Sequence, residues 1–158
     1  RSDAAISVLA LVTIALVVAA ISYTSYLSEQ QQRIVNMSRD MQTHIGRAHL
    51  WFEEGIQGDP TIDIERDFYM HLDAVAALAR NLQHGGQIPV GDAGAQDDDP
   101  EDRALLDQLP AQLARWRTLG DRRWADKTHS QPGSPLDQEF DGVFEEIYDY
   151  TRRAGSYS

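Results

Sequence analysis

The feature that most constrains this chain is an uncharged apolar run from Ala4 to Tyr26. In an α-helix, which rises about 1.5 Å per residue, about 20 such residues cross the hydrocarbon core of a bilayer. Tyr23 and Tyr26 lie at one end of the run, where amphipathic rings favour the headgroup layer. We therefore predict that residues 1–26 form a transmembrane anchor. The alternatives are a buried core helix and a cleaved signal peptide, since Ala19-Ala20 are small residues.

The charges beside this run predict its orientation. Arg1 precedes the run and the next basic residue is Arg33, so the positive-inside rule favours a cytoplasmic amino terminus. The sequence contains no second apolar run of that length. We therefore predict a single-pass membrane protein with its amino terminus in the cytoplasm and residues 27–158 outside the cytoplasmic membrane.

Beyond the apolar run, the sequence has the periodicity of helices rather than strands. Seven positions form a heptad seam that predicts one long helix to about Gln57: Leu27, Ile34, Met37, Met41, His44, Ala48 and Trp51. Three later stripes have steps of three and four: Ile64, Phe68, Leu72, Val75, Ala79 and Leu82; Leu106, Leu109, Leu113 and Trp116; Leu136, Phe140, Val143, Ile147 and Tyr150. The predicted fold is therefore all-α, with an N-terminal transmembrane helix followed by an antiparallel four-helix bundle over residues 27–158.

Turn-forming residues separate the predicted helices. Gly58-Asp59-Pro60 ends the first helix, and Gly85-Gly86 ends the second. Residues 85–99 have no apolar period and are predicted to form a long loop. The residues expected to cap the later helices are Asp59 or Thr61, then Asp99, then Ser134. Gly155 ends the last helical pattern.

The composition excludes several classes of function. A net charge of −11 without a local basic patch argues against nucleic-acid binding. The absence of cysteine removes disulfides, cysteine-ligated zinc, iron–sulfur clusters and thiol nucleophiles. No nucleophile elbow and no glycine-rich loop after a strand can be recognised. We therefore expect neither an enzyme activity nor a cofactor.

Two pairs of possible metal ligands have helical i, i+4 spacing: His49 with Glu53, and Asp67 with His71. Antiparallel packing about the first turn would bring both pairs to a similar height, where they could bind zinc or another divalent metal. Because His49 and Glu53 lie on the flank of the predicted seam, surface ion pairs are the competing interpretation. The acidic run 97–99 lacks the ligand pattern of an EF-hand and is interpreted as a solvated loop.

Residues 49–86 contain a distinctive set of short motifs: His49-Leu50-Trp51-Phe52-Glu53-Glu54, Gly58-Asp59, Ile64-Glu65-Arg66-Asp67, Leu72-Asp73 and Gly85-Gly86. With these motifs the segment resembles part of the extracytoplasmic four-helix-bundle sensor regions of bacterial membrane signalling proteins, including histidine kinases, diguanylate cyclases and chemoreceptors. The resemblance implies a single-pass, membrane-anchored sensor of the bacterial inner (cytoplasmic) membrane, with residues 27–158 in the periplasm. Such a sensor binds a small molecule or a partner protein between its long helices. The implied partners are the lipid bilayer and either a second copy of the chain or other membrane-protein subunits.

One departure from that family leaves a second interpretation open. Sensors of this type have a second span and a cytoplasmic output domain after the last helix, and neither occurs up to Ser158. The alternative is a single-span accessory subunit that docks onto a larger bacterial membrane protein complex. A second apolar run beyond Ser158 would favour the sensor.

Overall fold

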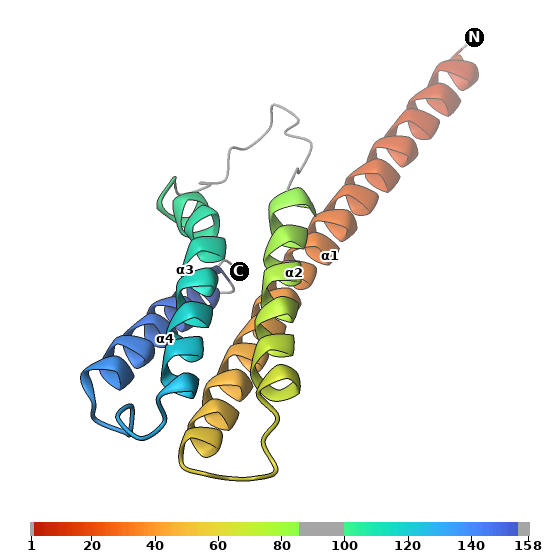
Figure 1. Cartoon of the computed structure of the whole chain (residues 1–158). Helices are drawn as coiled ribbons and strands as arrows, with labels where there is room; N and C mark the ends of the chain where they lie inside the picture. The colour runs from red at the N-terminus through yellow and green to blue at the C-terminus, as the bar shows by residue number, and fades with distance from the viewer. Residues whose placement is uncertain (1, 86–99, 155–158) are drawn as a thin grey trace. The chain divides into compact units, whose positions relative to one another are not determined.

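The computed structural model describes residues 2–85 and 100–154, and every regular element in these two ranges is helical. The elements are α1 (Ser2–Ile56), the short π-helix η1 (Glu65–Tyr69), α2 (Met70–Gly85), α3 (Pro100–Ala125) and α4 (Pro135–Ala154) (Figure 1). The predicted all-α class is confirmed for these residues. The chain divides into two compact units, Arg1–Ile34 and Val35–Ser158, and helix α1 contributes residues to both.

The first unit contains the apolar part of α1 and, within it, the predicted anchor. Every side chain from residue 11 to residue 26 is exposed. Among them Leu11 and Leu16 are the most open of the large apolar side chains, at 67% and 66%. Helix α1 is long and apolar enough to cross a membrane, and it is the single helix of this kind in the described residues.

In the second unit, one aromatic ring from each of four helical segments meets in the core. The four rings are Phe52 of α1, Phe68 of η1, Trp116 of α3 and Phe140 of α4, and all are buried. The ring of Phe52 lies 4.7 Å from that of Phe68 and 4.6 Å from that of Phe140, between centroids. Trp116 lies 5.3 Å from both Phe68 and Phe140. Such pairs contribute about 0.5–1.5 kcal/mol each beyond the burial of their area.

The three later apolar stripes are buried largely as the sequence predicts. The buried members are Phe68, Leu72, Val75, Ala79 and Leu82; Leu109, Leu113 and Trp116; Phe140, Val143 and Ile147. Ile64, Leu136 and Tyr150, at the ends of their stripes, are partly exposed. The side chain of Leu106 lies outside the described part. These faces allow α3 to pack against both α2 and α4 (Figure 1).

The predicted heptad seam of α1 is wrong at three positions. Ile45 is buried where the seam placed His44, which is only partly buried. Ser38 and Phe52 are likewise buried where the seam placed Met37 and Trp51, which are only partly buried. The buried residues of α1 include Met41, Ile45, Ala48, Phe52 and Ile56. With Ser38, which is also buried, these residues keep steps of three and four. The predicted period is therefore present, but every second position of the buried face lies one residue later than the seam placed it.

The second helical segment begins later than predicted. Asp59 accepts hydrogen bonds from the amide and the hydroxyl of Thr61, at 2.8 and 2.7 Å, and so closes a turn before the helix. Asp63 then caps the helix, because its carboxylate accepts the amide of Glu65 at 3.0 Å. The carboxylate of Asp67 accepts the amide of Asp63 at 2.8 Å, which makes the cap reciprocal.

The start of α4 is as predicted. Ser134 Oγ accepts the amide of Asp137 at 3.2 Å, and Asp137 accepts the amide of Gly133 at 2.6 Å. Gly133 has a φ of 88°, a left-handed conformation that glycine adopts without strain. Helix α2 ends at Gly85, and α3 begins at Pro100, as the sequence predicts. The rest of the predicted loop 85–99, the cap at Asp99 and the stop at Gly155 lie outside the described residues.

Candidate functional site

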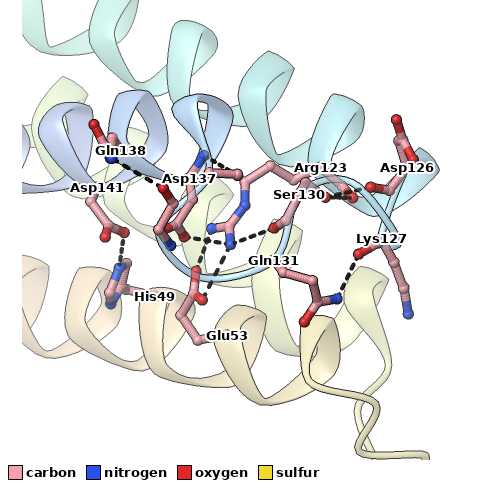
Figure 2. Close-up of polar contacts among 12 residues, drawn as sticks. His49, Glu53, Arg123, Asp126, Lys127, Ser130, Gln131, Asp137, Gln138 and Asp141 are labelled. Atoms are coloured by element: carbon pink, nitrogen blue, oxygen red, sulfur yellow. Dashed lines mark hydrogen bonds and ion pairs between the residues drawn. The ribbon is translucent and has the colours of Figure 1, made fainter.

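Arg123, near the carboxyl end of α3, is charged and fully buried. Its guanidinium forms ion pairs with Glu53 of α1 and with Asp137 of α4, the latter at 2.6 Å between Nη2 and Oδ1. Figure 2 shows these side chains converging from three helices. Because a charge is costly in the core unless it is paired, the cluster fixes α1, α3 and α4 against one another.

Two aromatic faces complete the surroundings of this guanidinium. The Cζ atom of Arg123 lies 4.8 Å from the ring centroid of Phe140 and 5.4 Å from that of Phe52. A desolvated cation over such a ring gains up to about 2 kcal/mol. Only arginine has a planar, forked cation that pairs with carboxylates along its edge and stacks on rings through its face.

The connection between α3 and α4 closes over the same side chain. Arg123 Nη2 donates to the carbonyl of Ser130 at 3.2 Å. The hydroxyl of Ser130, which is buried, lies 2.8 Å from the carbonyl oxygen of Arg123 and 2.6 Å from that of Asp126. The loop therefore depends on the same cluster as the helices (Figure 2).

His49 lies beside this cluster and pairs with Asp141 of α4. Its Nε2 atom is 2.9 Å from Oδ1 of Asp141. The imidazole is stacked on Phe144, with ring centroids 4.0 Å apart and planes 16° apart. Together with Glu53, one helical turn away on α1, these residues offer three ligand atoms within 4.8 Å of one another.

Of the four residues predicted to form a metal site, only His49 and Glu53 therefore lie in one group. His49 and Glu53 lie together as predicted, but their third partner is Asp141 rather than Asp67 or His71. Asp67 is occupied by Arg66, whose Nε and Nη2 both donate to it at 2.7 Å. The hydrogen bonds from Arg66 hold the pKa of Asp67 below its usual value of 3.8. Protonation of that carboxylate is therefore disfavoured.

His71 forms a pair with His44 of α1. The two Nδ1 atoms are 2.6 Å apart, and the ring of Trp51 lies 5.0 Å from that of His71. Burial lowers the pKa of His71 from its usual 6.5, and the nearby charges of His44 and Arg47 lower it further. The neutral imidazole is thus the form that the fold favours.

The sequence analysis missed Arg123, Asp137 and Asp141. A signal for the two acids exists, since Asp137 and Asp141 are four residues apart on α4 and flank the buried Phe140. Arg123 continues the buried stripe of α3 beyond Leu119 by one turn. A basic residue in a stripe position suggests a buried ion pair, although the sequence does not identify its acidic partner.

Comparisons with models of known protein families, with curated proteins and with solved structures give no match to this chain. A function for the cluster must therefore be argued from its own chemistry.

Proposed function

We propose that this chain is the sensor module of a bacterial membrane signalling protein and has no enzymatic role. The observation that carries the proposal is that α1 contains both the apolar stretch and the residues that hold the second unit together. Phe52 of α1 contacts the rings of η1 and α4, and Glu53 pairs with the buried Arg123 of α3. A ligand that prefers one packing of α2–α4 against α1 would shift the population of α1 arrangements.

For the second unit we propose an antiparallel four-helix bundle made of α1 from Val35 onward, η1 with α2, α3 and α4. The shared aromatic core supports this arrangement, as do the brief connections between α1 and η1 and between α3 and α4. Brief connections favour antiparallel neighbours, and bundles of this type form ligand sites between facing helices. The resemblance of residues 49–86 to extracytoplasmic sensor regions is consistent with the same arrangement.

We further propose that α1 spans the inner membrane once and that the second unit lies in the periplasm. Because the chain has no cysteine, single-cysteine variants can test this directly. A membrane-impermeant maleimide should label Thr128→Cys, an exposed position, in intact cells. It should label Ser2→Cys only after lysis. The reverse pattern would contradict the orientation.

The sensor role itself is tested with the full chain in lipid nanodiscs. A panel of small solutes is screened for one that raises the melting temperature, and gentle detergent extraction followed by mass spectrometry identifies what co-purifies. Stabilisation by one solute, with the chain as a homodimer, is the expected result. A stoichiometric large membrane complex in place of the homodimer would contradict it and would indicate an accessory subunit.

A further inference from the structure

Three side chains that could each bind a metal ion converge beside Arg123 from two helices. His49 and Glu53 lie one turn apart on α1, and Asp141 approaches them from α4 (Figure 2). We infer that these three residues form a binding site for a divalent transition-metal ion of the Zn²⁺ type. Three protein ligands, with a fourth position open to water or another ligand, are a common arrangement for zinc.

The distances fit an ion of this size. Zinc–nitrogen and zinc–oxygen bonds are about 2.0–2.2 Å long, so two ligand atoms at tetrahedral angles lie roughly 3.3–3.5 Å apart. The His49 Nε2 and Asp141 Oδ1 atoms are 2.9 Å apart, and all three ligand atoms lie within 4.8 Å. Metal binding at Nε2 leaves the neutral imidazole of His49 with its proton on Nδ1, and separates Nε2 from the Asp141 oxygen by only a few tenths of an ångström. The Glu53 oxygen reaches the ion by rotation of its side chain, over at most about 1.3 Å.

The charges around the site favour a divalent cation. Glu53 and Asp137 pair with one guanidinium, that of Arg123, and Asp141 pairs with His49, which is a metal ligand only in its neutral form. The excess of negative charge therefore equals the charge of one divalent ion. The side chain of Asp141 is 45% exposed and that of His49 is 23% exposed, so an ion can enter from solvent.

The surrounding residues orient the ligands. Phe144 stacks on the imidazole of His49 and limits its rotation. Arg123 donates to Glu53, and a carboxylate has lone pairs enough to accept this hydrogen bond and still bind a metal. This hydrogen bond fixes the orientation of the Glu53 carboxylate, as outer-shell partners of metal ligands do.

The donor set predicts which ions bind. One imidazole nitrogen with two carboxylates suits Zn²⁺, Ni²⁺ or Cu²⁺, whereas Mg²⁺ and Ca²⁺ prefer sites made of oxygen alone. Bound metal would fasten α1 to α4 beside the buried arginine. The claim that this metal is the signal detected by the sensor rests on the proposed function. The claim that the three residues bind a metal does not depend on it.

The test measures binding of Zn²⁺ to the full chain in detergent, with any purification tag removed so that added histidines do not compete. Isothermal titration calorimetry should give one ion per chain. Asp141→Asn and His49→Gln should each weaken binding at least about tenfold, and Mg²⁺ should not compete. His129→Gln is the matched control, because His129 and Asp126 form an exposed pair at 2.7 Å outside the cluster. This control should bind Zn²⁺ as the parent chain does.

The inference is overturned if Asp141→Asn binds Zn²⁺ as tightly as the parent chain, or if His129→Gln weakens binding as much as Asp141→Asn does. The side chain of Asp141 is about half exposed, so Asp141→Asn should fold even if His49→Gln does not, and the test then rests on Asp141→Asn.

A second measurement separates this inference from the sensor proposal. If Zn²⁺ binds at His49 and Asp141 and the chain co-purifies in a large complex, the site stands and the sensor role fails. If another solute stabilises a homodimer while Zn²⁺ does not bind, the sensor role stands and the metal site fails.

Discussion

Both halves of helix α1 are rich in apolar residues, yet their surroundings differ. From residue 11 to residue 26 the side chains are exposed on every face of the helix. From Met41 to Ile56 the buried residues instead follow one face, and the remaining positions are exposed or partly exposed. A helix that is apolar all round requires an apolar environment, whereas a helix with one apolar stripe packs on a globular core.

The difference shows where each half obtains its stabilisation. The later half buries Phe52, Ile45 and Met41 against other residues of its own unit. The earlier half leaves Leu11, Leu16 and Ile21 more than half exposed, and a large exposed apolar patch marks a surface that contacts lipid or another protein. Within the described part of the chain, no residues therefore cover the apolar half of α1.

The largest expected effect comes from placing charge in the apolar half. Val12→Arg combined with Leu16→Arg should cost about 5–7 kcal/mol of membrane insertion, since each arginine costs about 2.5–3.5 kcal/mol at the centre of a span. The variant should leave the membrane fraction during a carbonate wash. Thr43→Arg with Leu50→Arg places the same charges at exposed positions of the later half and should leave the protein in the membrane. Equal behaviour of the two variants would remove the distinction between the halves.

In the second unit the largest effect should come from the buried arginine. Arg123→Met leaves Glu53 and Asp137 without their cation and should lower the free energy of unfolding by about 3–5 kcal/mol in denaturant titrations. Arg115→Met, on the same helix, breaks only the exposed pair with Glu139 and should cost about 0–1 kcal/mol. A loss at Arg123 no greater than that at Arg115 would show that the cluster does not hold the helices together.

Local patterns predict much of this fold from the sequence. The stripes from Phe68 to Leu82 and from Phe140 to Ile147 identify buried faces because a helix repeats every 3.6 residues. Ser134 identifies the start of α4 because the capping bond is local. The heptad seam of α1 failed at Met37, His44 and Trp51. At each of these positions the next residue, Ser38, Ile45 or Phe52, is buried instead. Both choices keep steps of three and four from Met41 and Ala48, and only the neighbouring helices select between them.

The candidate site was less predictable because its partners are distant in sequence. The spacing of His49 and Glu53 was visible on one helix, but the third member, Asp141, comes from α4. Asp67 has the same chemistry and i, i+4 spacing from His71, yet it is not among the three residues whose ligand atoms lie together. Which carboxylate faces a histidine depends on how helices rotate against one another, and a single sequence does not specify that rotation.

The corrected face of α1 can be tested with two neighbouring residues. Phe52→Ala removes a buried ring and should cost about 3–5 kcal/mol in denaturant titrations. Leu50→Ala removes a side chain that is 54% exposed and should change stability by less than about 0.5 kcal/mol. The opposite ranking would mean that the buried face lies elsewhere on the helix.

A smaller effect is expected where helix α3 approaches η1. A Cβ atom on Gly120 would lie 2.6 Å from Cε1 of Phe68, so Gly120→Ala should destabilise the chain by about 1–3 kcal/mol through overpacking. Gly142 of α4 is exposed, with nothing near its Cβ position, so Gly142→Ala should stabilise it by about 0.4–1 kcal/mol. Thermal melts of both variants in detergent compare them directly. Equal shifts would show that α3 and η1 are not in close contact.

The smallest effect expected is a pH dependence located in the second unit alone, since no histidine lies in the apolar half of α1. Burial lowers the pKa of His71 below 6.5, with His44 and Arg47 acting in the same direction and Asp67 opposing them. The unfolded chain then binds more protons than the folded one, so stability is greatest above about pH 6.5 and falls as the pH decreases below it.

The free energy of unfolding, measured between about pH 8 and about pH 5.5, should therefore decrease more steeply for the parent chain than for His71→Asn. His129→Asn, which removes an exposed imidazole, should keep the steep decrease of the parent chain. Asp67 does not obscure this window, because its pKa is lowered from 3.8 and its contribution is lost only in stronger acid. A parent chain and His71→Asn with the same slope would show that the imidazole of His71 is accessible to water, and would place the His44–His71 pair outside the core.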